Sequence, residues 1–260
     1  SAFFFFFYAF GHHISYLRIS ITDRCNERCR YCMLDEEQPW FPKDEVLSYD
    51  ELLRVARVGA GLGVKKLRVT GGEPLTRPGV AEFCAQLRAI PGIQDLGIST
   101  NGTLLSKPHE GGTLAGALAA AGVRTVNISL DSLDREVYLR GTRRDLLPKV
   151  LEGIQAAREA GFESIKLNCV LMKGQTETEL AALARFSWEQ GLLLRFIELM
   201  PVSTRDVLDD DHFLATGTAR RLLEAQMGPL TPRTDYRTNG PAAYYETAQP
   251  GQLVGFIGAM

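Results

Sequence analysis

The sequence has few cysteines, no surplus of one charge and no long hydrophobic run. Its five cysteines are too few for a disulfide framework in a chain of 260 residues. Its 29 Lys and Arg against 31 Asp and Glu give a net charge of −2, which excludes a polybasic surface for nucleic acid or membranes. The longest apolar run, Ala2–Phe10, is far shorter than the ~20 residues of a membrane span and lacks the basic flank of a signal peptide. We therefore expect a soluble, cytoplasmic protein with no nucleic-acid or membrane partner.

The composition is that of a folded protein with a large core. Apolar residues make up 45% of the chain and charged residues 23%. A chain of this length hides roughly 70–75% of the surface that its unfolded form exposes, which excludes a disordered chain and a disulfide-stapled miniprotein. The length fits two small domains or one large one, since barrels of about 250 residues are often single domains.

Short β-rich runs alternate with longer helical patterns up to residue 200. The predicted strands are Leu17–Thr22, Leu67–Thr70, Leu96–Thr100, Thr125–Leu130, Ile165–Leu171 and Leu193–Met200. The predicted helices between them are Tyr49–Leu62, Val80–Ala89, Leu114–Ala121, Leu147–Ala160 and Glu177–Gln190. Strict alternation with short links implies right-handed crossovers and a parallel sheet. Six such units form either a doubly wound sheet or a partial barrel, and periodicity alone does not choose between them.

The strands themselves favour the barrel, because each of four strands has one apolar and one polar face. In the second strand Leu67 and Val69 share one face, and the other face carries Lys66, Arg68 and Thr70. Strands covered by helices on both faces would be almost continuously apolar. We therefore predict an α/β fold, an open, partial (β/α)6 barrel of the TIM type that holds a large polar ligand inside. An antiparallel sheet with one solvent face would alternate similarly, but the helix-length inserts argue against it.

Residues 201–260 differ in composition from the rest and are rich in Pro, Thr and Asp. They carry one predicted helix, Thr218–Gln226, and two predicted strands near Ala242–Thr247 and Gln252–Ile257. We predict three parts in the chain: an N-terminal segment (1–15), the partial barrel (16–200) and an incomplete, truncated C-terminal region (201–260).

Three of the five cysteines lie within eight residues, directly after the first predicted strand: Cys25, Cys29 and Cys32. This is the edge of an α/β barrel at which catalysis occurs. Three thiolates at these spacings can hold a small iron–sulfur cluster and leave one iron without a protein ligand. The same spacing also forms one stripe of a buried helix, although the residues between the cysteines are mostly charged. We favour an iron–sulfur cube, with a three-cysteine zinc site as the main alternative.

The motif Cys25-x3-Cys29-x2-Cys32, with an aromatic residue before the last cysteine, precedes a second motif, Thr70-Gly71-Gly72-Glu73-Pro74. Together these motifs resemble the radical S-adenosylmethionine superfamily. Further stretches match in order and at consistent spacing from about Phe10 to about Ile257; they are Leu17–Asp23, Thr100–Thr103, Asn127–Leu133 and Arg195–Pro201. With these stretches the chain resembles the family of GTP 3′,8-cyclases, which begin molybdenum cofactor biosynthesis.

The resemblance implies a set of binding residues. The three cysteines would hold a [4Fe–4S] cluster whose fourth iron is chelated by S-adenosylmethionine. Contacts to S-adenosylmethionine are implied for Tyr31, Gly72, Ser129 and Met200. Contacts to GTP are implied for Arg18, Arg68, Ser99 and Lys166, with serine at position 99 where the family usually has threonine. The radical step requires no general base, so we predict no catalytic side chain.

The three cations of this set lie on polar faces of the predicted strands. A cation inside a barrel is costly unless it meets an anion, and a triphosphate is a suitable anion. For any one of Arg18, Arg68 and Lys166, the structural alternative is an ion pair with Asp131 or Glu198.

The implied reaction is that of a lyase converting GTP to (8S)-3′,8-cyclo-7,8-dihydroguanosine 5′-triphosphate. The reduced cluster splits S-adenosylmethionine, and the resulting 5′-deoxyadenosyl radical removes hydrogen from C3′ of the ribose, after which C3′ closes onto C8 of guanine. The implied partners are an electron donor for the cluster, a second copy in a homodimer and the next pathway enzyme, cyclic pyranopterin monophosphate synthase.

One departure from the family concerns a second cysteine triad, whose cluster binds the guanine base. The remaining cysteines here, Cys84 and Cys169, lack that spacing and are expected in the core. We expect this chain to hold the first cluster and S-adenosylmethionine but to be impaired in binding guanine and completing the cyclisation. A radical enzyme acting on another substrate and a non-catalytic metal-binding protein are the alternative functions.

Overall fold

The computed structural model describes residues 14–33, 39–200, 212–238 and 240–258. The predicted N-terminal segment and its apolar run Ala2–Phe10 fall almost wholly outside these residues. The chain divides into two compact units, which we call the first and the second unit. The first unit comprises residues 1–26, 39–127 and 149–165, and the second comprises 27–38, 128–148 and 166–260. The predicted boundaries at residues 15 and 200 stay predictions.

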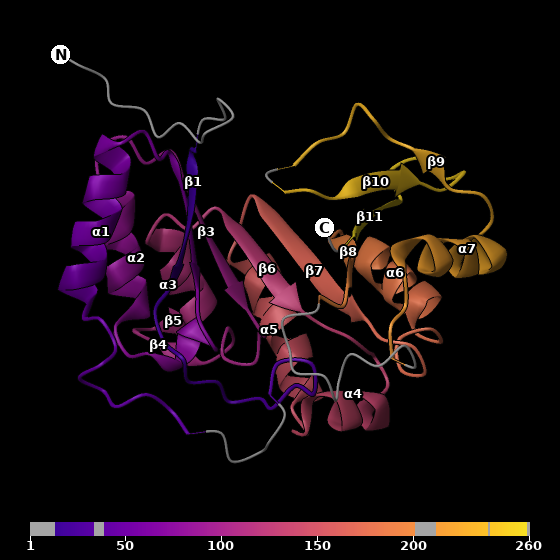
Figure 1. Cartoon of the computed structure of the whole chain (residues 1–260), viewed down its shortest axis with the longest axis horizontal. Coiled ribbons are helices and arrows are strands. Elements are labelled where there is room, and N and C mark those ends of the chain that lie inside the picture. Colours follow the sequence, from indigo (N-terminus) through magenta and orange to yellow (C-terminus); the bar gives the residue numbers. More distant parts are fainter. Residues whose placement is uncertain (1–13, 34–38, 201–211, 239, 259–260) are drawn as a thin grey trace. The chain divides into compact units, whose positions relative to one another are not determined.

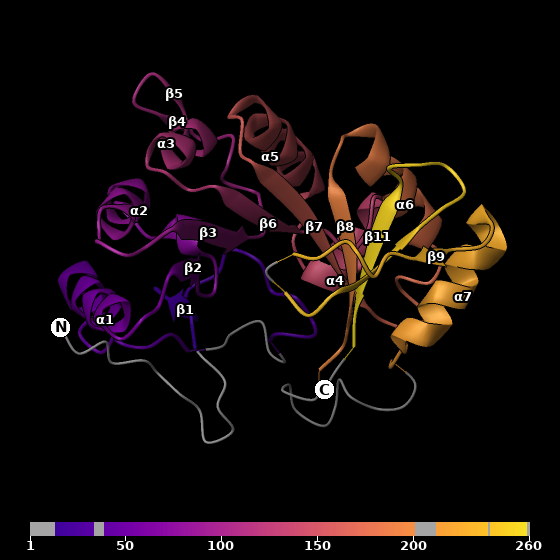
Figure 2. The same cartoon turned by 90° about the horizontal axis from the view of Figure 1, so that it is seen from above.

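The first unit is built on the parallel strands β1 (Tyr16–Ser20), β2 (Lys66–Thr70) and β3 (Asp95–Thr100), which pair in this order. Its helices lie on one face of these strands in Figure 2; they are α1 (Tyr49–Gly61), α2 (Val80–Arg88) and α3 (Leu114–Ala120). A short turn of 3-10 helix, η1 (Pro74–Thr76), follows β2, and a small hairpin of β4 (Pro108–His109) and β5 (Gly112–Thr113) precedes α3. Among the described residues β1 pairs with β2 alone, so the sheet is open at this edge.

The local sequence explains how α1 begins. The Ser48 side chain accepts a hydrogen bond from the backbone of Glu51, and the Glu51 carboxylate accepts one from the backbone of Ser48 at 2.7 Å. This reciprocal capping satisfies two backbone donors that have no partner inside the helix. The structure thus has a capping box at Ser48, and the predicted first helix is confirmed.

Two elements connect the units along the chain: β6 (Thr125–Ser129) and α5 (Leu147–Glu159). The second unit contains three parallel strands: β7 (Ser164–Leu171), β8 (Leu193–Glu198) and β11 (Leu253–Ile257). The first two residues of β7 belong to the first unit, and the strand belongs to the second unit from Lys166 onward. Two antiparallel strands follow β11 in the sheet, β10 (Ala243–Glu246) and β9 (Thr231–Pro232). Its helices are α4 (Arg135–Thr142), α6 (Leu180–Glu189) and α7 (Thr216–Met227), and α6 and α7 lie side by side in Figures 1 and 2.

The position of β11 explains its apolar sequence. This strand pairs with β8 on one side and with β10 on the other, so it is an inner strand. Val254 is fully buried, and Trp188 of α6 donates its indole N–H to the carbonyl oxygen of Leu253 at 2.8 Å. An inner strand needs apolar side chains to pack against neighbours.

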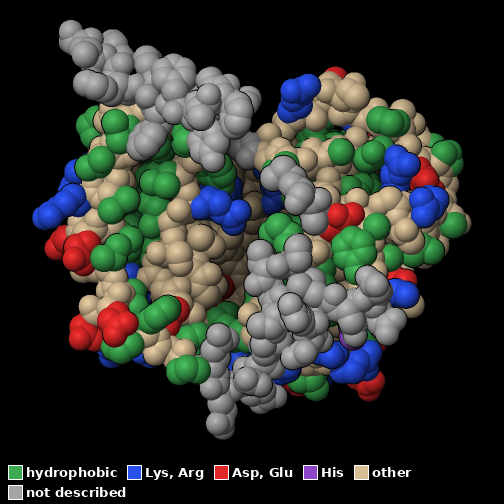
Figure 3. All heavy atoms as spheres, viewed as in Figure 1, with side chains coloured by type: hydrophobic (Ala, Val, Ile, Leu, Met, Phe, Trp, Pro, Cys, Tyr) green, Lys and Arg blue, Asp and Glu red, His purple; other side chains and the backbone are tan. Residues whose placement is uncertain are grey.

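The alternation of apolar and polar strand faces is confirmed. The apolar faces are buried at Leu67 and Val69 in β2 and at Val126 and Ile128 in β6. Parallel pairing in both units also excludes the antiparallel alternative. Large apolar side chains at the surface are scattered; Figure 3 shows some over the α1 side of the first unit, where Val55 and Val58 of α1 are exposed.

Several elements were not predicted from the sequence: α4, the β4–β5 hairpin, and the short elements η1 and β9. The helix α4 follows Asp134, whose carboxylate caps it by accepting from the backbone N–H of Glu136 and Val137. Its sequence is mostly polar and shows no clear apolar stripe, so periodicity missed it. The hairpin β4–β5 is too short for any periodic pattern. None of the described helices is long and apolar enough to cross a membrane.

Candidate cofactor and nucleotide site

The predicted site residues divide between the two units. The first unit holds Arg18, Cys25, Arg68, Gly72 and Ser99. The second holds Cys29, Tyr31, Cys32, Ser129, Lys166 and Met200.

In the first unit the glycine pair after β2 packs against the chain that leads to Cys25. The backbone N–H of Gly72 donates to the carbonyl oxygen of Thr22, and that of Glu73 donates to the carbonyl oxygen of Arg24, both at 2.7 Å. A Cβ atom on Gly72 would lie 2.4 Å from the carbonyl oxygens of Asp23 and Arg24. Only glycine fits this approach, because the atoms in the way belong to backbone.

Glu73 joins the loops that follow β2 and β3. Its side chain is buried and accepts from the backbone N–H of Leu75 at 2.9 Å and from that of Asn101 at 2.6 Å. It also accepts from the Thr100 hydroxyl at 2.8 Å. Asn101 in turn donates its amide to the side-chain oxygen of Asn26 at 2.9 Å, beside Cys25. The loops after β1, β2 and β3 are thus fixed to one another at the carboxyl ends of the strands.

Arg68 is buried in the same unit, and hydrogen bonds fix the position of its guanidinium. It donates to the Tyr16 hydroxyl at 2.7 Å, to the carbonyl oxygen of Ile98 at 3.1 Å and to the Thr125 hydroxyl at 3.0 Å. Gly97 leaves the necessary space, since a Cβ there would lie 2.7 Å from the Arg68 guanidinium. These three acceptors are neutral oxygens, and together they fix the orientation of the guanidinium.

Two other predicted GTP contacts flank Arg68. Arg18 of β1 is exposed and stands opposite Arg68 in the parallel register. Ser99 of β3 is half-buried, and its hydroxyl oxygen is buried without a hydrogen-bond partner among the described residues. A buried hydroxyl without a partner is costly, so this atom is suited to a ligand.

In the second unit the cysteine loop (residues 27–33) forms a tight turn. The backbone N–H groups of Cys32 and Met33 both donate to the carbonyl oxygen of Cys29 at 2.9 Å. Cys29 is half-buried and Cys32 is exposed, and Cys25 in the first unit is half-buried. The buried-stripe alternative for the cysteines is therefore wrong. The prediction that Cys84 and Cys169 belong to the core is confirmed, since both are fully buried.

Tyr31, in the middle of the turn, binds a buried carboxylate. Its hydroxyl donates to Asp131 at 3.0 Å, and the other oxygen of Asp131 accepts from the backbone N–H of Val170 at 2.8 Å. Burial raises the pKa of Asp131 to about 6, although both hydrogen bonds act in the opposite direction. Burial likewise raises the pKa of Tyr31, so its hydroxyl remains a donor.

The remaining predicted residues of the second unit lie at or near strand ends. Lys166 of β7 is buried, Ser129 at the end of β6 is half-buried, and Met200 is exposed. Beside Lys166, the buried Arg195 of β8 donates from two nitrogens to the Asn168 side-chain oxygen, at 3.0 and 2.7 Å. As with Arg68, this acceptor is neutral.

These side chains fit the groups that the sequence motifs imply. Free, accessible thiols at three positions supply the sulfur ligands that an iron–sulfur cluster requires. Buried cations, and a buried Ser99 hydroxyl that has no hydrogen-bond partner within the described ranges, suit a polyanionic nucleotide.

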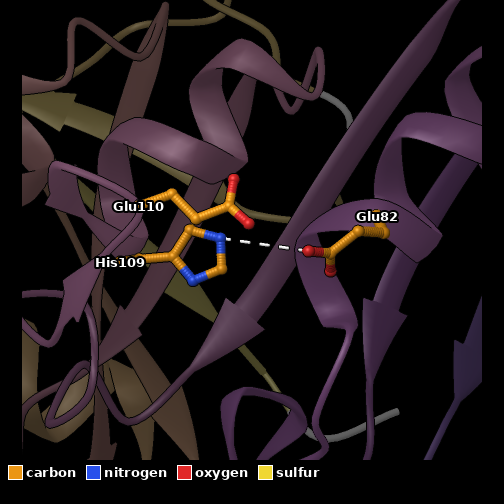
Figure 4. Close-up of side chains that lie close together, drawn as sticks. All are labelled: Glu82, His109 and Glu110. Carbon is orange, nitrogen blue, oxygen red and sulfur yellow. Dashed lines mark ion pairs between the residues drawn. The ribbon is translucent and has the colours of Figure 1, made fainter.

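A second group of ligating side chains lies elsewhere in the first unit (Figure 4). Glu82 of α2 faces His109 and Glu110 of the β4–β5 hairpin, with 4.0 Å between the Glu82 carboxylate and His109 Nε2. Both glutamates are exposed, and none of the three belongs to the predicted site. This group serves below as a control for metal binding.

Sequence reasoning gave no role to several residues that shape the site. Glu73 and Arg195 lie within the motifs of the sequence, but no role in the site was predicted for them. No sequence motif pointed to Gly97 or Asn168 as residues that shape the site. A buried charge opposite a glycine or an amide is visible only after the strands are paired. The sequence signal that could have found Arg195 is its polar alternation within an otherwise apolar strand.

Comparison with known proteins places the chain in a family. Residues 19–187 match the Radical SAM superfamily. A GTP 3′,8-cyclase 2 of Pseudomonas aeruginosa is 45% identical over 248 residues, covering 95% of this chain and 72% of that protein. GTP 3′,8-cyclases of Pelotomaculum thermopropionicum and Thermodesulfovibrio yellowstonii are each 41% identical, over 96% of this chain and 75% and 76% of their own lengths. The chain belongs to the GTP 3′,8-cyclase family.

Membership in the GTP 3′,8-cyclase family confirms the predicted enzyme class. Radical SAM proteins use a [4Fe–4S] cluster with S-adenosylmethionine, and GTP 3′,8-cyclases carry a second cluster. The same relatives support a radical SAM enzyme over the alternative of a non-catalytic metal-binding protein.

Solved structures confirm the fold. Streptococcus suis SuiB bound to S-adenosylmethionine matches with a TM-score of 0.65 at 19% identity, over 82% of this chain and 46% of that chain. Escherichia coli coproporphyrinogen III oxidase (HemN), a radical SAM enzyme, matches with a TM-score of 0.56 at 16% identity, over 82% of this chain and 50% of that chain. The chain thus has the predicted α/β partial-barrel fold and spans half or less of these two larger chains.

Proposed function

We propose that this protein binds GTP and S-adenosylmethionine and forms (8S)-3′,8-cyclo-7,8-dihydroguanosine 5′-triphosphate for molybdenum cofactor biosynthesis. The observation that carries the proposal is the set of three accessible thiols in a chain of the GTP 3′,8-cyclase family. When bound, the [4Fe–4S] cluster and S-adenosylmethionine supply the one-electron chemistry that starts the reaction.

The chain's own residues would bind and orient the two nucleotides. Cys25, Cys29 and Cys32 are the proposed cluster ligands. The proposed contacts to S-adenosylmethionine come from Tyr31, Gly72, Ser129 and Met200. Since a Cβ at Gly72 would collide with the chain before Cys25, Gly72 also allows its loop to approach that stretch of the first unit closely. Holding both reactants in place and excluding water is the protein's contribution to a radical reaction.

The proposed contacts to GTP are Arg18, Arg68, Ser99 and Lys166. Arg68 supports this role, because it is a buried cation whose guanidinium is fixed by hydrogen bonds to three neutral oxygens, and a guanidinium binds phosphate well. Ser99 supports it through its unpartnered hydroxyl, and serine retains the donor of the usual threonine.

The proposed partners follow from the reaction. They are a one-electron donor for the cluster, a second copy of this chain and cyclic pyranopterin monophosphate synthase as the receiver of the product. We propose the cytoplasm as the location, because all five thiols are free and reducing compartments keep thiols free.

Anaerobic reconstitution with iron, sulfide and reductant tests the proposal. We expect about four irons per chain for one [4Fe–4S] cluster and release of 5′-deoxyadenosine that rises when GTP is added. The matched variants are Cys29→Ala, which should lose the iron, and Cys84→Ala, which should retain it. The variant His109→Asn should also retain the iron, because the group in Figure 4 lies outside the proposed site.

Two outcomes would contradict the proposal. Release of 5′-deoxyadenosine that GTP does not stimulate would indicate a radical enzyme with another substrate. One zinc per chain without sulfide would indicate a metal site without redox chemistry.

The completion of the reaction needs its own test, since the sequence has no cysteine after Cys169. We expect these 260 residues to release 5′-deoxyadenosine but to form little cyclic product. Adding a C-terminal segment with a second cysteine triad should restore the product. Full product formation by the 260 residues alone would show that the guanine base is held in another way.

A further inference from the structure

A buried tyrosine and a buried glutamate lie behind one of the proposed cluster ligands. Glu27 precedes Cys29 by two residues and is almost completely buried, as is Tyr138 of α4. Buried side chains of this polarity are rare unless they are paired. No motif of the GTP 3′,8-cyclase family described above gives either residue a role.

The three side chains form one chain of hydrogen bonds. The Tyr138 hydroxyl donates to Oε1 of Glu27, and the Cys29 thiol lies 3.7 Å from Oε2 of the same carboxylate. Burial and the Glu27 charge both raise the pKa of Tyr138, so the tyrosine remains a donor. One oxygen of the carboxylate therefore faces α4 and the other faces the sulfur.

The backbone of the cysteine loop is fixed to the end of the same helix. Arg28 donates its N–H to the carbonyl oxygen of Thr142 at 2.9 Å, and Arg30 donates to that of Gly141 at 3.0 Å. The Arg143 side chain donates to the carbonyl oxygen of Met33 at 2.9 Å. The cysteine loop therefore lies along the last turn of α4 and is hydrogen-bonded to it.

From this arrangement we infer that Tyr138 and Glu27 are positioning residues, which hold the backbone around Cys29 against α4 and set the electrostatic environment of the cluster that Cys29 ligates. Ligation releases the thiol proton that bonds to Glu27, so the carboxylate then acts on the cluster through its charge. The inference rests on the proposed function, because it requires Cys29 to be a ligand. Hydrogen bonds and charge near the sulfur ligands tune the reduction potential of iron–sulfur clusters. A negatively charged carboxylate beside the ligating sulfur makes reduction of the cluster by one electron less favourable. A phenol that donates a hydrogen bond to this carboxylate reduces that effect.

Two conservative variants should shift the potential in opposite directions. In Tyr138→Phe the carboxylate loses its donor, so the midpoint potential of the cluster should become more negative than in the wild type. In Glu27→Gln the negative charge is removed, so the midpoint potential should become more positive. A redox titration followed by electron paramagnetic resonance, at one pH and without substrate, measures both shifts.

The matched control is Tyr244→Phe in β10. Tyr244 is as buried as Tyr138 and its hydroxyl bonds with Thr238 at 2.9 Å, so the variant loses a similar contact. It should leave the potential unchanged. Hydrogen exchange of the protein without its cluster gives a second measurement: Tyr138→Phe should speed exchange at the amides of Arg28 and Arg30 several-fold, and Tyr244→Phe should not.

The outcomes separate this inference from the proposed function. If the wild type binds no [4Fe–4S] cluster, the proposed function fails and the inference with it. If the wild type binds the cluster but both variants keep its potential and its spectrum, the inference alone is wrong. Equal shifts in Tyr138→Phe and Tyr244→Phe would show a general effect on folding and would also overturn it.

Discussion

Two loops that carry the proposed cofactor residues are held in different ways. The glycine loop of the first unit is fixed by backbone against backbone, with hydrogen bonds of 2.7 Å from Gly72 and Glu73. The cysteine loop of the second unit has backbone hydrogen bonds to α4 from Arg28 and Arg30, and side chains hold it as well, with Tyr138 bonded to Glu27 and Tyr31 to Asp131. Contacts between backbones tolerate no added atom, whereas side-chain contacts can be weakened one at a time.

The largest effect should come from Gly72→Ala. The added Cβ would lie 2.4 Å from two carbonyl oxygens, so the backbone of one loop must move. We expect a loss of about 3 kcal/mol in the free energy of unfolding, measured with urea. The control Gly61→Ala, at the end of α1, has nothing within 4 Å of the new Cβ and should be neutral or slightly stabilising. Equal losses in both variants would contradict the close approach at Gly72.

An intermediate effect, dependent on pH, should come from Asp131. Its folded pKa of about 6 lies above the ordinary value, so the folded protein holds this proton to higher pH than the unfolded chain does. The contribution of Asp131 to stability is therefore complete below about pH 4 and falls as the pH rises through 6, by up to about 3 kcal/mol.

The variant Asp131→Asn isolates this contribution: its one side-chain oxygen can accept from the Val170 N–H, and its amide nitrogen can donate to the Tyr31 hydroxyl, which accepts as well as donates. The difference in unfolding free energy, wild type minus variant, should fall between pH 4 and pH 7. A difference that rises over this range would mean that the folded protein stabilises the charged carboxylate instead.

The smallest effect should come from the ion pair between Arg135 and Asp145 at the surface of the second unit. Their side chains are 68% and 41% exposed, so water screens the pair despite its distance of 2.5 Å. We expect Asp145→Asn to leave the urea midpoint within experimental error at neutral pH. A clear loss in that variant would show that the first turn of α4 is held from the surface, in addition to the contacts of its last turn with the cysteine loop.

Much of the fold could be predicted because local sequence signals agree with it. The capping box at Ser48 fixes the start of α1, and the predicted strands and helices of the first unit begin and end within two residues of the observed ones. The helix α6 begins at Leu180, three residues later than predicted, because Glu179 is its N-cap and accepts instead from Ser132 and Leu133. These two hydrogen-bond donors lie 47 and 46 positions before Glu179, so no local sequence pattern shows the interaction.

The candidate site was predicted unevenly for the same reason. The spacing of Cys25, Cys29 and Cys32 is local, so the sequence shows it directly. The partners of Arg68 and of Glu27 come from distant parts of the chain, with Tyr138 lying 111 residues after Glu27. Only folding brings such residues together.

By itself, then, the sequence determined the parallel strand-and-helix alternation, the cysteine spacing and the family, since each is encoded in a short stretch of chain. Tertiary structure alone decided that α4 supports the cysteine loop, that Gly97 makes room for the Arg68 guanidinium and that Ser99 keeps a hydroxyl without a partner. The physical reason is that burial and hydrogen bonding are properties of pairs of segments, and the identity of each pair is fixed only when the strands and helices pack.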